Sequence, residues 1–247
     1  MKAILLTLFI FILSTQLFAQ RIEISLQANS GLFHYSGNDA ASTTFINEGG
    51  ISDYANNPYG NKNGFSYGGD VQAQYVSKSG FITGIQAGYE VLRSNVDIDE
   101  YNPSIITVFT DATGAFQIPV KGQAFLQDQD ININPYIGYR LDLKKIKIDI
   151  MPGMDIGINV NSYDKGSATA TDGTVYKVDN KMSDAPIDLR LRFGIAAWFK
   201  RFGLTAGYAY GLTNFASNLD VNAGGGSTPA PNAHSELIRF GISYRIF

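Results

Sequence analysis

The stretch Asp184–Leu212 reads DAPIDLRLRFGIAAWFKRFGLTAGYAYGL, and it decides the fold. From Ile187 to Phe199 the side chains alternate between an apolar and a more polar set, and after Lys200-Arg201 the alternation restarts at Phe202. Successive side chains of a β-strand point to opposite faces, so this period of two predicts two strands joined by a two-residue turn. One face of the predicted hairpin is apolar and aromatic, whereas the other carries arginine, aspartate and glycine.

An apolar face opposite a charged face is typical of transmembrane β-barrels, which turn the apolar face to lipid. The same alternation recurs in six further runs, which start near Ile22, Phe65, Phe81, Asp130, Ile146 and Ile238. Together the runs predict an all-β fold, an eight-stranded antiparallel up-and-down transmembrane β-barrel. The mean hydropathy of −0.05 agrees, because half of each barrel strand is polar.

Short and long connections alternate along the predicted barrel. The short ones are Ser77–Gly80, Asp142–Lys145 and Lys200-Arg201, and those after the odd-numbered strands are much longer. In outer-membrane barrels the short turns are periplasmic and the long loops extracellular. An even strand count then places both termini at the periplasmic rim, where the first and last strands can pair and leave no open edge.

Outward-facing aromatic residues fall into one group near each rim, and we expect them to form two interfacial girdles. The group near the short turns is Tyr75, Phe81, Tyr139, Phe199, Phe202 and Tyr244, and the group near the long loops is Phe65, Tyr67, Tyr89, Tyr208 and Tyr210.

The segment Arg93–Gln127 is open to two interpretations. Asn95–Ser104 is polar, whereas Ser104–Thr110 and Ala115–Val120 have strand character, with Asp111–Gly114 as a turn between them. Each run is shorter than the roughly 9–11 residues of a tilted membrane strand, which favours a hairpin standing above the membrane. Two further barrel strands, ten in all, are the alternative.

Two further segments carry specific expectations. Ser162–Ser183 is predicted to be a long loop with a local hairpin turn at Asp172-Gly173. Pro135 and Pro152 lie inside predicted strands of a closed barrel, where their missing N–H groups have no edge to face. We expect them to sit opposite each other, with a bulge or a local break in the ladder.

Met1–Ala19 has the features of a secretory signal peptide: Lys2, the apolar run Ile4–Leu13, and a small residue before a cut at Gln20. The apolar run is too short for a membrane-spanning helix. The expected domains are therefore a signal peptide at 1–19 and one outer-membrane β-barrel at 20–247. Removing 19 of 247 residues leaves 228, with 18 basic and 22 acidic side chains and a net charge of −4.

The acidic balance argues against nucleic acid as a partner. With no cysteine in the chain, disulfides and thiol chemistry are excluded. The partners that we expect are outer-membrane lipid and the barrel-insertion machinery, with an envelope protein as a further candidate.

Several short motifs resemble the PorT-like outer-membrane β-barrel family of Gram-negative bacteria, over the whole exported chain. They are Phe18-Ala19-Gln20, Asn134–Gly138, Met151-Pro152-Gly153, Tyr210–Asn214 and Ser243–Phe247. The resemblance implies an outer-membrane location and a terminal aromatic strand that the insertion machinery reads. Some family members are linked to protein secretion and gliding. Phe247 departs from the family pattern, because it is out of phase with the apolar stripe of its strand.

The interior of an eight-stranded barrel is only wide enough for its own side chains. Glycines at 203, 207 and 211 leave one inner wall nearly bare, and long charged side chains on the other strands can fill that space. We expect an ion-paired plug, since a buried charge left alone is costly. An ion or small-solute channel is the alternative. The expected cations are Arg140, Arg190, Arg192, Arg239 and Arg245, and the expected partners are Glu23, Asp70, Glu90, Asp149, Asp155 and Asp188.

Barrel closure would bring the two histidines, His34 and His234, to the outer rim, near Ser36, Ser235 and Glu236. A His–Ser–acid set could hydrolyse an ester, as in outer-membrane lipid A deacylases, and a histidine pair could bind a metal ion. No motif holds these residues at a chemical spacing. We therefore assign no catalytic, cofactor-binding or metal-binding residue and expect no enzymatic activity.

The sequence thus predicts a non-enzymatic integral outer-membrane barrel that acts in surface interaction or in envelope or secretion assembly through its long loops. The alternatives are a rim hydrolase and a small-solute channel. A soluble lipocalin-like barrel would turn Arg190 and Arg192 to solvent, and the paired girdles and one-sided loops argue against it.

Overall fold

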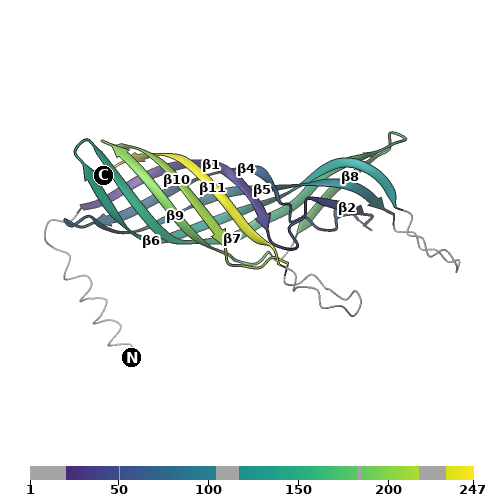
Figure 1. The fold of residues 1–247 in the computed structure, drawn as a ribbon, viewed down its shortest axis with the longest axis horizontal. Helices are drawn as coiled ribbons and strands as arrows, with labels where there is room; N and C mark the ends of the chain where they lie inside the picture. The colour runs from purple at the N-terminus through teal and green to yellow at the C-terminus, as the bar shows by residue number, and fades with distance from the viewer. Residues whose placement is uncertain (1–20, 50, 104–116, 183–184, 217–231) are drawn as a thin grey trace, which may run out of the picture.

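The computed structural model describes residues 21–49, 51–103, 117–182, 185–216 and 232–247. Eight strands form a closed antiparallel ring in the order β1–β4–β5–β6–β7–β9–β10–β11 (Figure 1). The predicted eight-stranded barrel is therefore confirmed, and the ten-stranded alternative is wrong. The ring strands are β1 Arg21–Ser36, β4 Lys62–Val76, β5 Phe81–Asn102, β6 Ile118–Leu143, β7 Ile146–Ala170, β9 Asp188–Phe199, β10 Phe202–Gly211 and β11 His234–Arg245.

Strand β1 closes the ring by pairing on both sides. It pairs with β11 from Ser25 opposite Arg245 to Ser36 opposite His234, and with β4 along nearly its whole length. The barrel therefore has no open edge that could pair with another chain. The three short connections and the C-terminus lie at one rim, at the left of Figure 1.

The two faces of the wall differ as the alternation predicts. On β9, Leu191 is 53% exposed on the outer face, while its neighbour Arg190 is 0% exposed inside. The turn Lys200-Arg201 joins β9 and β10 as predicted. A ring with an apolar outside and a charged inside is a transmembrane β-barrel. In the described parts of the chain, no helix has the length and hydropathy to cross a membrane.

Three ring strands run on beyond the barrel and build a second structure, which we call the extension. β5 and β6 stay paired as far as Tyr101 and Ile118, and β7 continues into a hairpin with β8 (Val175–Met182). Two short strands complete the extension, β2 (Thr43–Asn47) beside β5 and β3 (Tyr54–Ala55) beside β2. The hairpin that we expected above the barrel, Ser104–Thr110 with Ala115–Val120, lies mostly outside the described residues, and the extension is built from the segments on either side of it.

The composition of the extension differs from the prediction. Its β5 arm includes Asn95–Asn102, whereas the sequence-based prediction treated this segment as polar and assigned it no strand. Acidic and amide residues on the outer face hide the alternation of Val96 and Ile98 on the buried face. The prediction of a long loop at Ser162–Ser183 is wrong, because residues 162–170 belong to β7 and residues 175–182 to β8, with only the turn 171–174 between them. The turn at Asp172-Gly173 is confirmed, with Gly173 at a φ of 87°.

Some expectations fall outside the described residues. They are the signal peptide at 1–19, the run Ser104–Thr110 and the turn Asp111–Gly114. Most of the last long loop is also outside.

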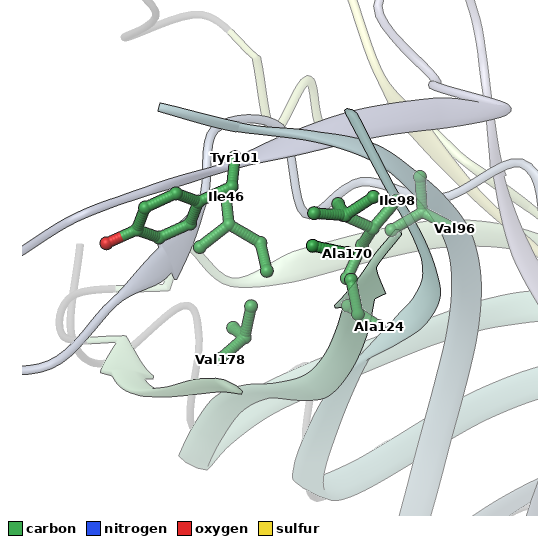
Figure 2. Close-up of a cluster of buried hydrophobic side chains, with 9 residues drawn as sticks. Ile46, Val96, Ile98, Tyr101, Ala124, Ala170 and Val178 are labelled. Atoms are coloured by element: carbon green, nitrogen blue, oxygen red, sulfur yellow. The ribbon is translucent and has the colours of Figure 1, made fainter. Parts of the chain in front are cut away.

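The extension has its own hydrophobic core (Figure 2). Ile46 from β2, Val96 and Ile98 from β5, and Val178 from β8 meet there, and the rings of Tyr101 and Tyr176 stack 3.8 Å apart beside them. The residue before β3 links the two ends of this curved sheet, because the Asp179 amide of β8 donates to the Asp53 carbonyl at 3.3 Å. Several strands from distant parts of the sequence are thus held by one buried cluster.

The two strand prolines break the β6–β7 ladder without shifting its register. The register places Pro135 opposite Met154, so the expectation that Pro135 faces Pro152 is wrong by two residues. Both prolines keep their pairing on the other side, with Ile85 and Phe193. The side chain of Asn134 donates to the Met154 carbonyl, which replaces the bond that Pro135 cannot make.

Candidate functional site

The lumen is the first candidate site, and its shape follows from the glycine-lined wall of β10. A Cβ atom added at Gly203 would lie 2.8 Å from the Trp198 ring, and one added at Gly211 would lie 2.4 Å from Ser235 Oγ. The absent side chains therefore make room for groups from neighbouring strands. This agrees with the expectation that one bare wall faces bulky partners.

A first ionic cluster fills the lumen near the short turns. Arg140 donates to both oxygens of Glu23 at 2.8 Å, and to both oxygens of Asp149 at 2.6 and 2.7 Å. Arg245 lies 2.9 Å from Glu23 and stacks on Trp198, with 4.2 Å between the guanidinium carbon and the ring centroid. The Trp198 indole N–H donates to Asp149 at 2.9 Å. Every partner in this cluster is at most 7% exposed.

A second ionic cluster fills the middle of the lumen. Arg190 and Arg239 both contact Glu90, and Arg239 also contacts Asp155. Asp188 lies 3.4 Å from Arg190, and Arg192 lies 3.4 Å from Asp155. Each cation therefore faces at least one carboxylate, as an ion-paired plug requires.

Amide and phenol groups connect the two ionic clusters. The Gln72 side chain donates to the Tyr136 hydroxyl, which donates to Gln74 at 2.9 Å. Gln74 in turn donates to Glu23 at 2.8 Å, and Arg192 donates to Gln86 at 2.6 Å. This polar layer was not among the predictions made from the sequence, although the inward phase of these residues could have revealed it.

An apolar layer closes the lumen at the end that faces the extension. Tyr35 packs edge-on against Phe33, Tyr59 and Phe215 at centroid distances of 5.1 to 5.2 Å. Its hydroxyl donates to Asp128 at 2.9 Å. Aromatic rings from β1 and from two long connections therefore lie above the charged layers.

Five of the six predicted carboxylate partners join the ionic clusters, and Asp70 does not. Asp70 accepts from the Asn29 side chain, and its Oδ1 atom has no protein partner. A void of about 20 Å³ adjoins it, which is space for roughly one water molecule. Asp128 and Asp130 are two further buried lumen carboxylates that the sequence analysis did not single out as ionic partners.

The histidine residues form the second candidate site, on the outer face of the opposite rim. His34 pairs with Glu236 across the strands, with 3.8 Å between the ring nitrogen and the carboxylate, and Ser36 pairs with His234. Ser235 points the other way, into the lumen, where it donates to Asp188 at 2.9 Å. His234 Nδ1 lies 2.9 Å from the Thr213 carbonyl oxygen, and Tyr208 donates to Glu236 at 3.0 Å.

These contacts do not assemble a hydrolase. Within the described segments neither Ser36 nor Ser235 hydrogen-bonds a histidine, so the pair that would activate a nucleophile is not formed. Nor do those segments hold a group of three His, Asp or Glu side chains placed to bind a metal ion. The closure of β1 on β11 brings the histidines to one rim, as expected, and separates Ser235 from them.

No protein-family model matches the chain, and no curated protein matches it. Among solved structures, Neisserial surface protein A is 12% identical with a TM-score of 0.37, over 90% of this chain and 96% of that chain. Ail, the attachment invasion locus protein of Yersinia pestis, is 11% identical with a TM-score of 0.31, over 92% and 98%. The translocator domain of autotransporter NalP from Neisseria meningitidis is 12% identical with a TM-score of 0.23, over 99% and 96%. Likenesses this distant carry no argument, and the fold rests on the chain's own ring of hydrogen bonds.

Proposed function

We propose that this chain is a non-enzymatic outer-membrane protein whose closed barrel anchors the extension at the cell surface, where the extension binds another molecule of the envelope or its surroundings. In this proposal the short turns and both termini face the periplasm, in the usual arrangement of such barrels. The PorT-like resemblance of five short motifs supports the same location, and membership of that family belongs to the proposal.

The observation that carries the proposal is the separate core of the extension. Strands β5, β6 and β7 continue well past the ring and bury Ile46, Ile98 and Val178 together with six other side chains. A barrel that only spanned the membrane would end its strands at the rim. Ordered structure outside the barrel, on the side of the long connections, is placed to contact other molecules.

The filled lumen supports the same proposal from the other side. Two ionic clusters, a polar layer and an aromatic layer cross the interior. In this proposal the barrel is therefore not a transport channel, and its wall supports the extension.

The test is to remove the β5–β6 and β7–β8 arms of the extension and leave the ring intact. The pairs Asn95–Phe125 and Tyr163–Lys181 mark where each hairpin can be closed with an Asn-Gly turn. The full chain and this shortened chain would each be captured from the native membrane, and the accompanying proteins identified. A variant that replaces only the tip residues 171–174 is the matched control.

We expect a partner with the full chain and the tip variant and none with the shortened chain, which should still fold, as shown by different migration of boiled and unboiled samples. Retention of the same partners by the folded, shortened chain would contradict the proposal.

A further inference from the structure

The rim of the short turns carries a dense positive patch. The turns Lys144-Lys145 and Lys200-Arg201 are neighbours, because Ile146 pairs with Phe199, and the Arg245 amide donates to the Arg201 carbonyl at 2.8 Å. Together they border an open cavity of about 680 Å³. Among the described residues, its lining has six basic side chains and no aspartate or glutamate: Lys144, Lys145, Lys147, Lys200, Arg201 and Arg245, with Trp198, Phe199 and Phe247. We call the first five of these residues the basic rim.

Most of the charge of the basic rim is not neutralised by the protein. Lys147 lies 3.6 Å from Asp142, and this is the one ion pair that the basic rim makes with the described residues. The chain as a whole has a net charge of −3, so the patch does not reflect its composition.

Lysine is not the residue that the backbone conformation of these two turns favours. Lys144 and Lys200 have φ values of 58° and 55°, and they are the only residues other than glycine with positive φ in the described chain. Glycine or asparagine adopts this conformation with less strain, and two-residue hairpin turns favour them. Backbone geometry therefore does not account for lysine at these two positions, whereas its charge can.

Aromatic side chains fix the level of the patch relative to a bilayer. Phe199 and Phe202 are 52% and 67% exposed on the outer face, and Phe202 packs against Tyr244 at 5.2 Å. The Lys200 amino group lies 5.6 Å from the centroid of the Phe199 ring. Outward aromatic rings sit at the lipid–water interface, so the adjoining ammonium groups lie at the level of the lipid phosphates.

We propose that the basic rim binds the phosphate headgroups of anionic phospholipids in the leaflet that meets the short turns. Lysine and arginine hold phosphate by charge-assisted hydrogen bonds, and the exposed Phe199 and Phe247 can contact the acyl chains. The inference rests on the membrane-spanning barrel of the proposed function and adds a site and a ligand class to it.

The single tryptophan of the chain, Trp198, lines the same cavity and can report the site. The full chain would be reconstituted in phosphatidylcholine vesicles that contain a small fraction of lipid brominated in its acyl chains, either phosphatidylglycerol or phosphatidylcholine. Bromine quenches tryptophan at short range, so the ratio of the two quenching curves measures the preference for the anionic lipid. A variant with Lys144→Asn, Lys145→Asn, Lys200→Asn and Arg201→Asn removes four charges while asparagine keeps the turns.

The matched control removes four charges from the extension by Lys121→Asn, Lys165→Asn, Lys177→Asn and Lys181→Asn. We expect a preference of roughly fivefold for phosphatidylglycerol, equivalent to about one basic contact, in the wild type and the control. The rim variant should show no preference for phosphatidylglycerol. Added salt should weaken the preference of the wild type.

Equal quenching by both lipids in the wild type would overturn the inference and leave the barrel standing. Recovery of the chain apart from the vesicles on flotation would show that the chain is not in the bilayer, which would contradict the proposed function first. Equal quenching together with capture of an acidic periplasmic polypeptide, lost in the rim variant, would assign the basic rim to a protein partner and overturn the lipid assignment.

Discussion

At the scale of the residue, the lumen shows how one arginine can be held inside a barrel. Arg140 comes from β6 and meets Glu23 of β1 and Asp149 of β7 in two forked pairs, each with two hydrogen bonds. Burying the charges is costly, and the pairs offset that cost only while both sides are present. The arrangement is therefore sensitive to the loss of any one member.

Arg140→Ala leaves buried Asp149 without its cation and Glu23 with Arg245 alone, and it should lower the free energy of unfolding by roughly 3–5 kcal/mol. Arg140→Lys keeps the charge but loses the forked geometry, so its effect should be smaller. Urea unfolding in lipid vesicles, followed by Trp198 fluorescence, measures both. Equal stability of Arg140→Ala and the wild type would show that the cluster is not formed.

On the outer face, position along the strand should decide the cost of a charge. Ile195 pairs with Ala206 and Ile150 in the middle of the wall, whereas Leu191 pairs with Tyr210 of the outer girdle. Ile195→Arg should destabilise folding by roughly 2–4 kcal/mol and Leu191→Arg by about 1 kcal/mol or less.

The same vesicle unfolding measures this pair, with Thr205→Ser, inward and nearly isosteric, as the control. If Ile195→Arg and Leu191→Arg lower the stability equally, the level of the membrane on the barrel is assigned wrongly. If Thr205→Ser lowers the stability substantially, the two faces of the wall are assigned wrongly.

At the scale of the element, the extension is fastened by β3. The Asp164 side chain on β7 is 1% exposed and accepts the Ala55 amide of β3 at 3.0 Å. Burial raises the pKa of Asp164 from 3.8 to about 6. Because burial favours the neutral form of the Asp164 carboxyl group, the attachment of β3 depends on pH.

The pKa of Asp164 is higher in the folded extension than in the unfolded chain, so its favourable contribution is complete below about pH 4 and is lost as the pH rises through about 6. Asp164→Asn keeps an acceptor for Ala55 and should stabilise the extension at pH 7 by on the order of 2 kcal/mol. The rate of proteolysis within 51–57, compared at pH 5 and pH 8, measures the effect.

Asp172→Asn in the exposed turn is the control for this measurement. The Thr174 amide lowers the pKa of Asp172, so removing this carboxyl should not stabilise the extension at pH 7. Proteolysis of the wild type that is slower at pH 8 than at pH 5, after correction for the protease, would contradict the prediction.

At the scale of the whole molecule, closure of the ring and filling of the lumen act together. The barrel brings Arg239 against Glu90, which is 149 residues away in the chain, and Arg140 against Glu23, which is 117 residues away. The charged layers are therefore a property of the complete ring and of no hairpin by itself.

Purified protein in a planar bilayer should show no steady conductance, because side chains occupy the lumen of an eight-stranded barrel. Arg190→Ala together with Arg239→Ala opens space in the middle cluster and should add leak if the barrel still folds. Reproducible single-channel steps from the intact protein, abolished by these changes, would instead establish the channel that we set aside.

The sequence by itself determined the strand number of the ring, the outward and inward faces, the short turns and the residue types of the plug. These follow from local geometry, since a period of two assigns each side chain to a face wherever the strand lies. The inward arginines and carboxylates could be predicted as a set for the same reason.

Only the tertiary structure decided which arginine meets which carboxylate, the role of Tyr35 above the lumen and the separation of Ser235 from the histidines. It also showed that Asn95–Asn102 and Ser162–Met182 build an extension with a core. Such contacts depend on the registers of all eight strands added around the ring, and on distant segments such as β2 and β8 that are brought into one cluster. A single strand contains no information on that sum, because each register is set by pairing with its neighbours.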